Sequence, residues 1–305
     1  MKKPIFVVAS SFDGTVDYMI EKYEDDFSFV RFDIDRMDKY GISIDTTSGT
    51  QKVKFVSENF CSNDLFNDIS SIYFRKIFFP ELNEYDKRYR SYMLKEIYGF
   101  VSGLVDSFVG KVLTKPYILR RTENKIYQLF LAKELGFDVP NSSITNDPEY
   151  ATSTIERGDW IVKPVTTGKL NENAIVQTNK IVTDTIENIE LSPIYLQEYV
   201  EKEYELRVTV IDDKFYTVKI IASDKTDWRK NEHNNIYELI PTPYDVEKEC
   251  KKFLKKIGMR FGCFDYIFSK GKYRFLECNP NGQWLWLEKK LSLDISKHIL
   301  EYLNA

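Results

Sequence analysis

Two polar residues near the C-terminus have types and a spacing that suit metal binding. Glu277 and Asn279 lie in an apolar strand pattern over residues 273–279, which Pro280 ends. Side chains alternate along a strand, so both should point to the same face. A carboxylate beside an amide oxygen suits Mg2+, a hard cation that takes oxygen ligands. The alternative is a strand that ends in a polar turn, with Glu277 in a salt bridge.

A third acid lies upstream, inside the apolar run 261–268. Asp265 is its only acid, and a buried carboxylate needs a cation or a metal as partner. Residues 269–272 form a short turn signal between two strand patterns, which predicts a β-hairpin. Pairing across that turn should bring Asp265 close to Glu277 and Asn279, as in a nucleotide–metal site.

Candidate cations precede this cluster. Lys163 ends a strand predicted over residues 160–163, and the loop 165–169 follows with small residues whose N–H groups could cradle phosphate. The loop lacks the Walker pattern, so alone it is a weak signal. Lys125 belongs to a predicted helix with Thr122 as N-cap. Its apolar face is expected to consist of Ile126, Leu129, Phe130 and Leu135.

Further elements must position these groups. Residues 194–200 predict a strand and hinge, and residues 205–211 and 214–220 predict a hairpin around Asp212-Asp213. An amphipathic helix is expected over residues 245–258, with lysines on its solvated face. Apolar residues at three- and four-residue steps predict a long helix between Tyr89 and Phe108, with the stripe packed in the core. The chain start, with the buried-strand pattern 5–9, indicates an α/β lobe.

The composition excludes several classes of protein. The chain has 305 residues, 43% hydrophobic and 30% charged, which is typical of a globular protein with two or three lobes. A net charge of −4 gives no indication of nucleic-acid binding. No run approaches membrane-spanning length. Four scattered cysteines and two histidines make a zinc site unexpected, and the thiols suit a reducing cytoplasm.

These residues together resemble the ATP-grasp ligases. Asp265 followed by Glu277-x-Asn279-Pro280 is similar to the metal-binding end of that fold. The extension Gly282-Gln283-Trp284-x-Trp286 is similar to the graspetide (microviridin-type) synthetases, which cross-link ribosomal peptides. Asp227-Trp228-Arg229 resembles their D-x-R element; the alternative is a surface Asp–Arg pair. The resemblance covers most of residues 71–304, and residues 1–70 match only as a generic lobe.

The resemblance implies a role for each site residue. Lys125 and Lys163 would bind the nucleotide phosphates of ATP, and Asp265, Glu277 and Asn279 would bind Mg2+. Arg207 and Lys219 would face the phosphates from paired strands. Asp227 and Arg229 would contact the core peptide, with Arg229 on a substrate carboxylate. The hinge would consist of Gln197, Glu198, Tyr199 and Val200, with Glu198 and the backbone near Val200 at the adenine edge, and Glu205 would lie near the ribose.

The implied function is ATP-dependent formation of side-chain ester or amide crosslinks in a ribosomal precursor peptide, leader plus core, through an acyl phosphate. The implied fold is α/β (α+β): an N-terminal α/β lobe over residues 1–115, then ATP-grasp subdomains over 116–192 and 193–305. A homodimer is implied as well, with neither nucleic acid nor a membrane as partner. The alternatives are a RimK-like carboxylate–amine ligase that adds amino acids to a protein or small molecule, and a non-catalytic ATP-binding regulator.

Overall fold

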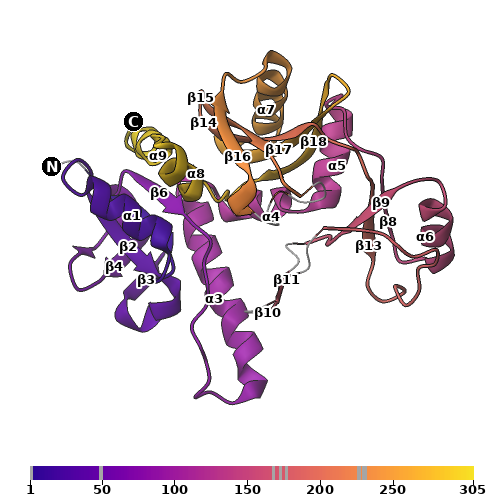
Figure 1. The fold of residues 1–305 in the computed structure, drawn as a ribbon. Coiled ribbons are helices and arrows are strands. Elements are labelled where there is room, and N and C mark those ends of the chain that lie inside the picture. The colour runs from indigo at the N-terminus through magenta and orange to yellow at the C-terminus, as the bar shows by residue number, and fades with distance from the viewer. Residues whose placement is uncertain are drawn as a thin grey trace. The chain divides into compact units, whose positions relative to one another are not determined.

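A computed structural model describes residues 3–47, 51–166, 169–171, 174–175, 178–224, 228 and 232–305. The chain forms two compact units (Figure 1). The first unit comprises Met1–Leu119, Met259–Phe261 and Gln283–Ala305; the second comprises Arg120–Gly258 and Gly262–Gly282. No helix in the described ranges combines the length and the apolar character needed to cross a bilayer.

The first unit is built on a four-stranded parallel sheet in the order β2-β1-β6-β7. Its strands are β1 (Ile5–Ala9), β2 (Phe29–Asp33), β6 (Ser71–Phe74) and β7 (Lys111–Leu113). The central strand β1 is buried throughout, as its continuous apolar run predicts. A second sheet joins β3 (Gly41–Asp45), β4 (Lys52–Val56) and β5 (Cys61–Ser62) in antiparallel pairs.

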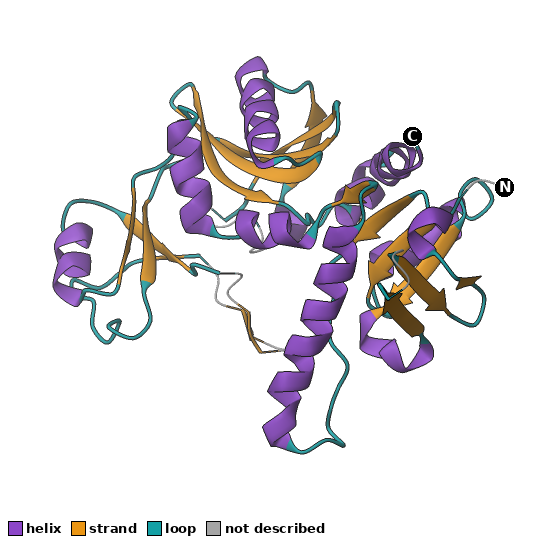
Figure 2. Cartoon of the chain, turned by 180° about the vertical axis from the view of Figure 1, so that it is seen from behind, coloured by secondary structure: helices purple, strands orange, loops and turns teal. Residues whose placement is uncertain are grey.

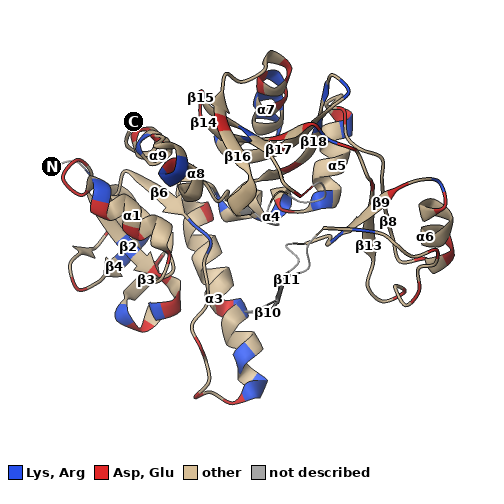
Figure 3. Ribbon diagram, viewed as in Figure 1, with Lys and Arg blue, Asp and Glu red and all other residues tan. Residues whose placement is uncertain are grey.

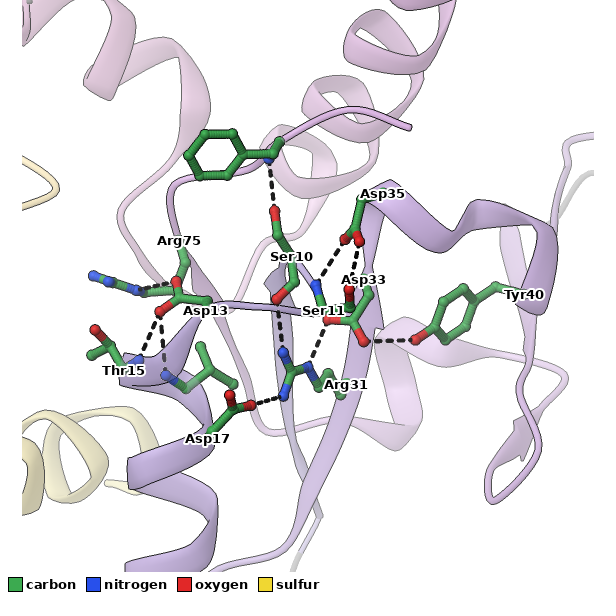
Figure 4. A network of polar contacts seen from close by, with 12 residues as sticks. Ser10, Ser11, Asp13, Thr15, Asp17, Arg31, Asp33, Asp35, Tyr40 and Arg75 are labelled. Atoms are coloured by element: carbon green, nitrogen blue, oxygen red, sulfur yellow. Dashed lines mark hydrogen bonds and ion pairs between the residues drawn. The ribbon is translucent and has the colours of Figure 1, made fainter. Parts of the chain in front are cut away.

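Ion pairs and hydrogen bonds tie together the carboxyl ends of β1 and β2 (Figure 4). Arg31 donates to the carboxylates of Asp17 and Asp33 and to the carbonyl of Ser10. Ser11 donates from its amide and hydroxyl to Asp35, at 2.7 and 2.5 Å. The network satisfies polar groups within the first unit where the parallel strands end.

Helices cover this sheet (Figure 2). They are α1 (Gly14–Tyr23), η1 (Ile34–Lys39), α2 (Leu65–Asp68), α3 (Lys87–Ser107), α8 (Leu285–Leu291) and α9 (Ile295–Asn304), while α4 (Pro116–Thr122) leads into the second unit. The long α3 is present as predicted, but its apolar stripe is not all core. Only Val101, Leu104 and Val105 are buried on α3, whereas Tyr89 and Tyr92 are 56% and 61% exposed. The amino-terminal half of α3 extends beyond the sheet (Figure 2).

The second unit contains two main sheets. One has the order β12-β9-β13-β8, in antiparallel pairs, and the other has the order β16-β15-β14-β17-β18. The first comprises β8 (Ser142–Thr145), β9 (Trp160–Lys163), β12 (Asn179–Lys180) and β13 (Ile194–Glu198). The strands β10 (Lys169–Asn171) and β11 (Ala174–Ile175) form a separate two-stranded sheet. The second comprises β14 (Tyr204–Ile211), β15 (Lys214–Ile221), β16 (Ile236–Ile240), β17 (Phe261–Ser269) and β18 (Lys272–Asn279).

Within its described residues, the second unit contains three α-helices, of which α7 agrees best with its sequence pattern. They are α5 (Lys125–Glu134), α6 (Pro148–Ile155) and α7 (Tyr244–Ile257), with η2 (Glu232–Asn234) as a short turn of 3-10 helix. Helix α7 confirms its prediction: Val246, Cys250, Phe253 and Leu254 are buried, and charged residues lie along its outer side (Figure 3). Gly258 ends α7 in the left-handed conformation, where a side chain would add strain.

Helix α5 corrects two predictions. Its N-cap is Asn124, whose side chain accepts a hydrogen bond from the Tyr127 amide at 3.1 Å, because α4 already includes Thr122. The expected apolar face is also wrong, since Phe130 is 72% exposed. The buried residues of α5 are Gln128, Leu131 and Ala132. A polar residue therefore occupies the inward face of the helix that carries Lys125.

Candidate functional site

The carboxylate pair forms as the hairpin pattern predicts. Strands β17 and β18 are antiparallel neighbours, and Asp265 lies directly opposite Glu277. Cys263 lies opposite Asn279, so the alternation of side chains places Glu277 and Asn279 on the face that carries Asp265. The Asn279 side-chain amide lies 3.3 Å from Asp265 Oδ2. Two carboxylates and one amide are thus gathered on one face of the sheet.

Arg207 provides the positive charge that buried Asp265 needs. From β14, its Nη1 lies 2.9 and 2.8 Å from the two carboxylate oxygens of Asp265. The residues are 5% and 3% exposed, so the pair is almost fully removed from water. Burial lowers the pKa of Arg207, but the charges of Asp265 and Glu277 raise it by more, so the guanidinium stays charged.

Lys125 contacts the backbone that directly follows Lys163, at the end of β9. Lys125 Nζ donates to the carbonyl of Pro164 at 3.0 Å, and Pro164 directly follows Lys163. The same ammonium lies 3.7 Å from Glu277 Oε2, and the two side chains are 19% and 21% exposed. Lys125 therefore links the end of β9 to the carboxylate cluster.

The second lysine is held by the neighbouring strand β13. Lys163 Nζ donates to Gln197 Oε1 at 2.6 Å, and Gln197 Nε2 donates to the Tyr195 hydroxyl at 3.0 Å. Tyr195 pairs directly with Lys163 across the ladder. Burial, reinforced by the negative charge of Glu277, raises the pKa of Tyr195 to about 12, so its hydroxyl stays protonated at neutral pH.

The hinge residues are fixed by local contacts. Glu198 Oε2 accepts a hydrogen bond from the Asn141 side chain at 2.8 Å, and the Tyr199 amide donates to the Asp159 carbonyl. Glu198, Tyr199 and Val200 are all half-buried. Further along, Glu205 forms a buried ion pair with Lys202 at 2.6 Å. The adenine and ribose roles of these residues stay predictions.

Lys219 corrects the expectation that it faces the same way as Arg207. The β14–β15 register pairs Lys219 with Leu206, and Arg207 with Val218. Directly opposed residues share a face, so Lys219 and Arg207 lie on opposite faces of the sheet. The Lys219 ammonium lies 4.8 Å from the centre of the Tyr204 ring and 3.9 Å from Glu238 Oε2. The structure does not bring Lys219 to the carboxylate cluster.

The remaining predicted positions are only partly visible. Asp227 and Arg229, the two charged members of the D-x-R element, lie outside the described residues, as do Thr167 and Gly168 of the loop after Lys163. Between the two charged residues, Trp228 is buried, and its carbonyl accepts a hydrogen bond from Asn235 Nδ2 at 2.6 Å.

Gly282 is required by close packing beside the cluster. A Cβ atom at this position would lie 2.2 Å from Cys263 Sγ and 2.8 Å from Cys263 Cβ. The Gly282 amide donates to the Asn279 carbonyl at 3.3 Å, which closes the turn after β18. The glycine in the Gly282-Gln283-Trp284 motif thus lets the turn that carries Asn279 lie against β17.

Sequence reasoning missed three residues that hold the site together: Gln128, Tyr195 and Lys202. None belongs to a recognisable motif, and Gln128 lies on the side of α5 away from Ile126, Leu129 and Phe130 of the predicted apolar face. Within the described residues, no three His, Cys, Asp or Glu side chains gather as a metal site. A metal at the cluster would therefore depend on two carboxylates, the Asn279 amide oxygen and ligands from a bound nucleotide.

Comparison with known proteins identifies the fold around this cluster. The family model of the RimK-like ATP-grasp domain matches residues 122–303. The chain belongs to the RimK-like ATP-grasp family. The carboxylate cluster and both lysines lie within the matched range, and the predicted ATP-grasp fold is confirmed. Members are ATP-dependent, ADP-forming ligases, so the chain is an ATP-grasp ligase. No curated protein matches the chain by sequence.

Solved structures of the same fold match nearly the whole chain. A RiPP-associated ATP-grasp ligase from Chryseobacterium gregarium, in complex with ADP and a leader and core peptide, is 27% identical with a TM-score of 0.88, over 99% of this chain and 96% of that one. The macrocyclase MdnC from Microcystis aeruginosa MRC, bound with precursor peptide MdnA, is 23% identical with a TM-score of 0.86, over 98% and 99%. D-alanyl-alanine synthetase A from Vibrio cholerae is 12% identical with a TM-score of 0.62, over 99% and 98%.

Proposed function

We propose that this ATP-grasp ligase forms intramolecular ester or amide crosslinks between side chains of a ribosomal precursor peptide. The similarity to the Chryseobacterium gregarium ligase carries the proposal, because it extends over 99% of this chain and that ligase binds ADP with a leader and core peptide. The similarity includes residues 1–121, which lie outside the range matched by the family model.

The carboxylate cluster fits Mg2+. The ion prefers oxygen ligands and is commonly held by one or two carboxylates together with substrate phosphates. Asp265 and Glu277 supply the carboxylates, and the Asn279 side chain supplies an amide oxygen on the same face. Arg207 stabilises Asp265 in its charged form, which is the form that binds a cation. Bound there, Mg2+ would neutralise charge on the nucleotide phosphates during phosphoryl transfer.

The surrounding residues suit the other parts of ATP. The ammonium groups of Lys125 and Lys163 already donate to oxygen atoms, at 3.0 and 2.6 Å, and in the proposal they donate to phosphate oxygens instead. Residues 197–200 hold the adenine, and Glu205 lies near the ribose. Arg207 faces the phosphates from β14 and also orients Asp265, to which it donates. Asp227 and Arg229 contact the core peptide, with Arg229 on the carboxylate that reacts.

The reaction needs no nucleophile from the protein. A substrate Asp or Glu carboxylate attacks the γ-phosphorus of ATP, the bond to the β–γ bridging oxygen breaks, and an acyl phosphate and ADP form. A Ser or Thr hydroxyl or a Lys amine of the same peptide then attacks the acyl carbon. Phosphate leaves, and the nucleophile loses its proton, which closes an ester or amide ring. The enzyme contributes positioning and charge stabilisation.

Further proposals rest on the same similarity. The substrate comprises a leader and a core, as in the complex of the Chryseobacterium gregarium ligase. The chain divides into an N-terminal lobe and two ATP-grasp subdomains at residues 115 and 192, and it forms a homodimer. The enzyme acts in the cytoplasm, a reducing compartment that suits its three buried free thiols.

The test is intact mass spectrometry of a candidate precursor peptide encoded beside the gene, after incubation with enzyme, ATP and Mg2+. We expect ATP-dependent loss of one water mass per crosslink, and fragmentation then locates the linked side chains. A peptide that gains free amino acids would instead support the RimK-like alternative. An unchanged peptide with no ADP formed, under conditions in which the enzyme binds ATP, would support the non-catalytic alternative.

A further inference from the structure

A glutamine lies behind the carboxylate cluster and contacts the backbone between its two strand-end members. Gln128 is 4% exposed on α5, and its side-chain oxygen accepts a hydrogen bond from the Cys278 amide at 2.7 Å. Its side-chain nitrogen donates to the Cys278 carbonyl at 2.9 Å and to the Thr122 carbonyl at 2.6 Å. One side chain thus binds both backbone polar groups of a single strand residue.

The contact satisfies an edge of the sheet. Strand β18 is the last strand in the order β16-β15-β14-β17-β18, so only β17 flanks it within the sheet. In an antiparallel ladder, alternate residues turn their N–H and C=O groups away from the partner strand. Cys278 is such a residue, and it is 1% exposed, so water cannot satisfy these groups. The amide of Gln128 takes the place of a neighbouring strand.

Cys278 lies between Glu277 and Asn279, the two residues of β18 that point to the cluster. Fixing both peptide groups of Cys278 fixes the directions of the flanking side chains, because each shares a peptide bond with Cys278. Lys125 precedes Gln128 by three residues, so both lie on the same side of α5. The helix thereby presents an ammonium group to Glu277 and an amide to Cys278 at once.

We infer that Gln128 is a positioning residue for the Mg2+–nucleotide site, an inference that rests on the proposed function. It touches neither the nucleotide nor the metal. It sets the orientation of Glu277 and Asn279 through the Cys278 backbone, and it holds the start of α5 at a fixed distance from β18. Groups that orient metal ligands in this way typically change metal affinity by about 10- to 100-fold when they are removed.

The test compares Gln128→Met, which has a similar length and no amide, with the wild-type chain. Binding of ADP is measured by calorimetry over a series of Mg2+ concentrations, without any peptide. We expect the Mg2+ concentration for half-maximal enhancement of ADP binding to rise by about tenfold or more in the variant. Binding of ADP without Mg2+ should change far less, since the lysines remain.

Ser269→Ala is the matched control. Ser269 is also buried, and its hydroxyl donates to the Glu201 carbonyl at 2.6 Å, at the opposite end of the same β17–β18 hairpin. The control should keep the wild-type Mg2+ dependence. If Gln128→Met does not yield folded protein, Gln128→Glu decides in its place, because it keeps the acceptor for the Cys278 amide and loses both donated hydrogen bonds.

The outcomes separate this inference from the proposed function. Wild-type Mg2+ dependence in the Gln128 variant, or an equal shift in Ser269→Ala, would overturn the positioning role and leave the ligase proposal standing. A wild-type chain that binds ADP equally well with and without Mg2+ would instead overturn the metal site itself. A shift of the Mg2+ dependence in the Gln128 variant but not in Ser269→Ala supports both the positioning role and the metal site.

Discussion

Asp265 and Glu277 are both proposed to bind Mg2+, yet the structure predicts that their substitution has different effects on stability. In Asp265→Asn, the guanidinium of Arg207 keeps its charge but loses the carboxylate that now lies 2.8 and 2.9 Å away. Arg207 is 5% exposed, so water cannot replace the lost partner without a rearrangement of β14 and β17.

The size of the effect follows from the burial of the pair. Removing one partner of a buried ion pair costs about 3–5 kcal/mol. The negative charge of Glu277 still acts on Arg207, so we expect the lower end, about 3 kcal/mol. For domains of roughly 150–250 residues, each kcal/mol lowers the melting temperature by about 2–4 °C. Asp265→Asn should therefore melt about 6–12 °C below wild type.

Glu277→Gln is the informative comparison. The Glu277 side chain is 21% exposed and pairs with Lys125 at 3.7 Å, so solvent screens the change and stability should stay within about 1 kcal/mol. Both variants should lose peptide-dependent ADP formation. The double variant Arg207→Met/Asp265→Asn removes the uncompensated charge, so it should recover most of the lost stability while remaining inactive.

Thermal unfolding of all three variants without nucleotide, together with an ADP-release assay, checks this reasoning. A melting temperature of Asp265→Asn equal to that of the wild type, or a double variant no more stable than the single one, would contradict the predicted cost of leaving Arg207 unpaired. Normal ADP release by Asp265→Asn and Glu277→Gln would refute their metal-binding role independently of the stability result.

Two other predictions concern packing and pH. Gly282→Ala places a Cβ 2.2 Å from Cys263 Sγ, and overpacking of this kind costs about 1–3 kcal/mol, which should lower the melting temperature. Adding Cys263→Gly to the same chain should partly restore the melting temperature. A melting temperature of Gly282→Ala equal to that of the wild type would contradict the clash. Burial raises the pKa of Glu249 from 4.5 to about 7. Between these two pH values the carboxyl group is protonated in the folded state and ionised in the unfolded state. The free energy of unfolding therefore falls as pH rises through that range. Glu249→Gln should flatten this slope in melting curves from pH 4.5 to 8, and a slope equal to that of the wild type would show that another group is responsible.

The closeness of Asp265 to Glu277 and Asn279 was predictable because the β17–β18 hairpin is local. Their shared face was not, since counting from the Ser269–Lys272 pair would place Asp265 opposite Leu276. A register shift between Asp265 and Tyr266 places Asp265 opposite Glu277 instead. Where a ladder has no such shift, counting from the turn does place a side chain, and it could have placed Lys219. The two-residue turn at Asp212-Asp213 pairs Ile211 with Lys214, and counting back along the ladder pairs Leu206 with Lys219. In this register Arg207 and Lys219 lie on opposite faces, so the expectation that both face the phosphates was wrong for Lys219.

Contacts between distant segments were not predictable in the same way. The periodicity of α3 and α5 correctly predicts helices, but it cannot show which apolar residues another element covers. Tyr89, Tyr92 and Phe130 are exposed for this reason, although they fit the helical pattern. Gln128 shows the converse: its burial depends on a strand that lies 150 residues further along the chain. A helix pattern carries no information about that partner.

The charges of the cluster explain how it is stable before a nucleotide binds. Arg207 and Lys125 together balance Asp265 and Glu277, so the site buries no net charge among these four groups. The two pairs differ, since Arg207–Asp265 is almost fully buried whereas Lys125–Glu277 is wider and partly exposed. The first pair can therefore persist through the reaction as a fixed support. The second can exchange at little cost, with Lys125 turning to phosphate oxygens and Glu277 to the metal that accompanies them.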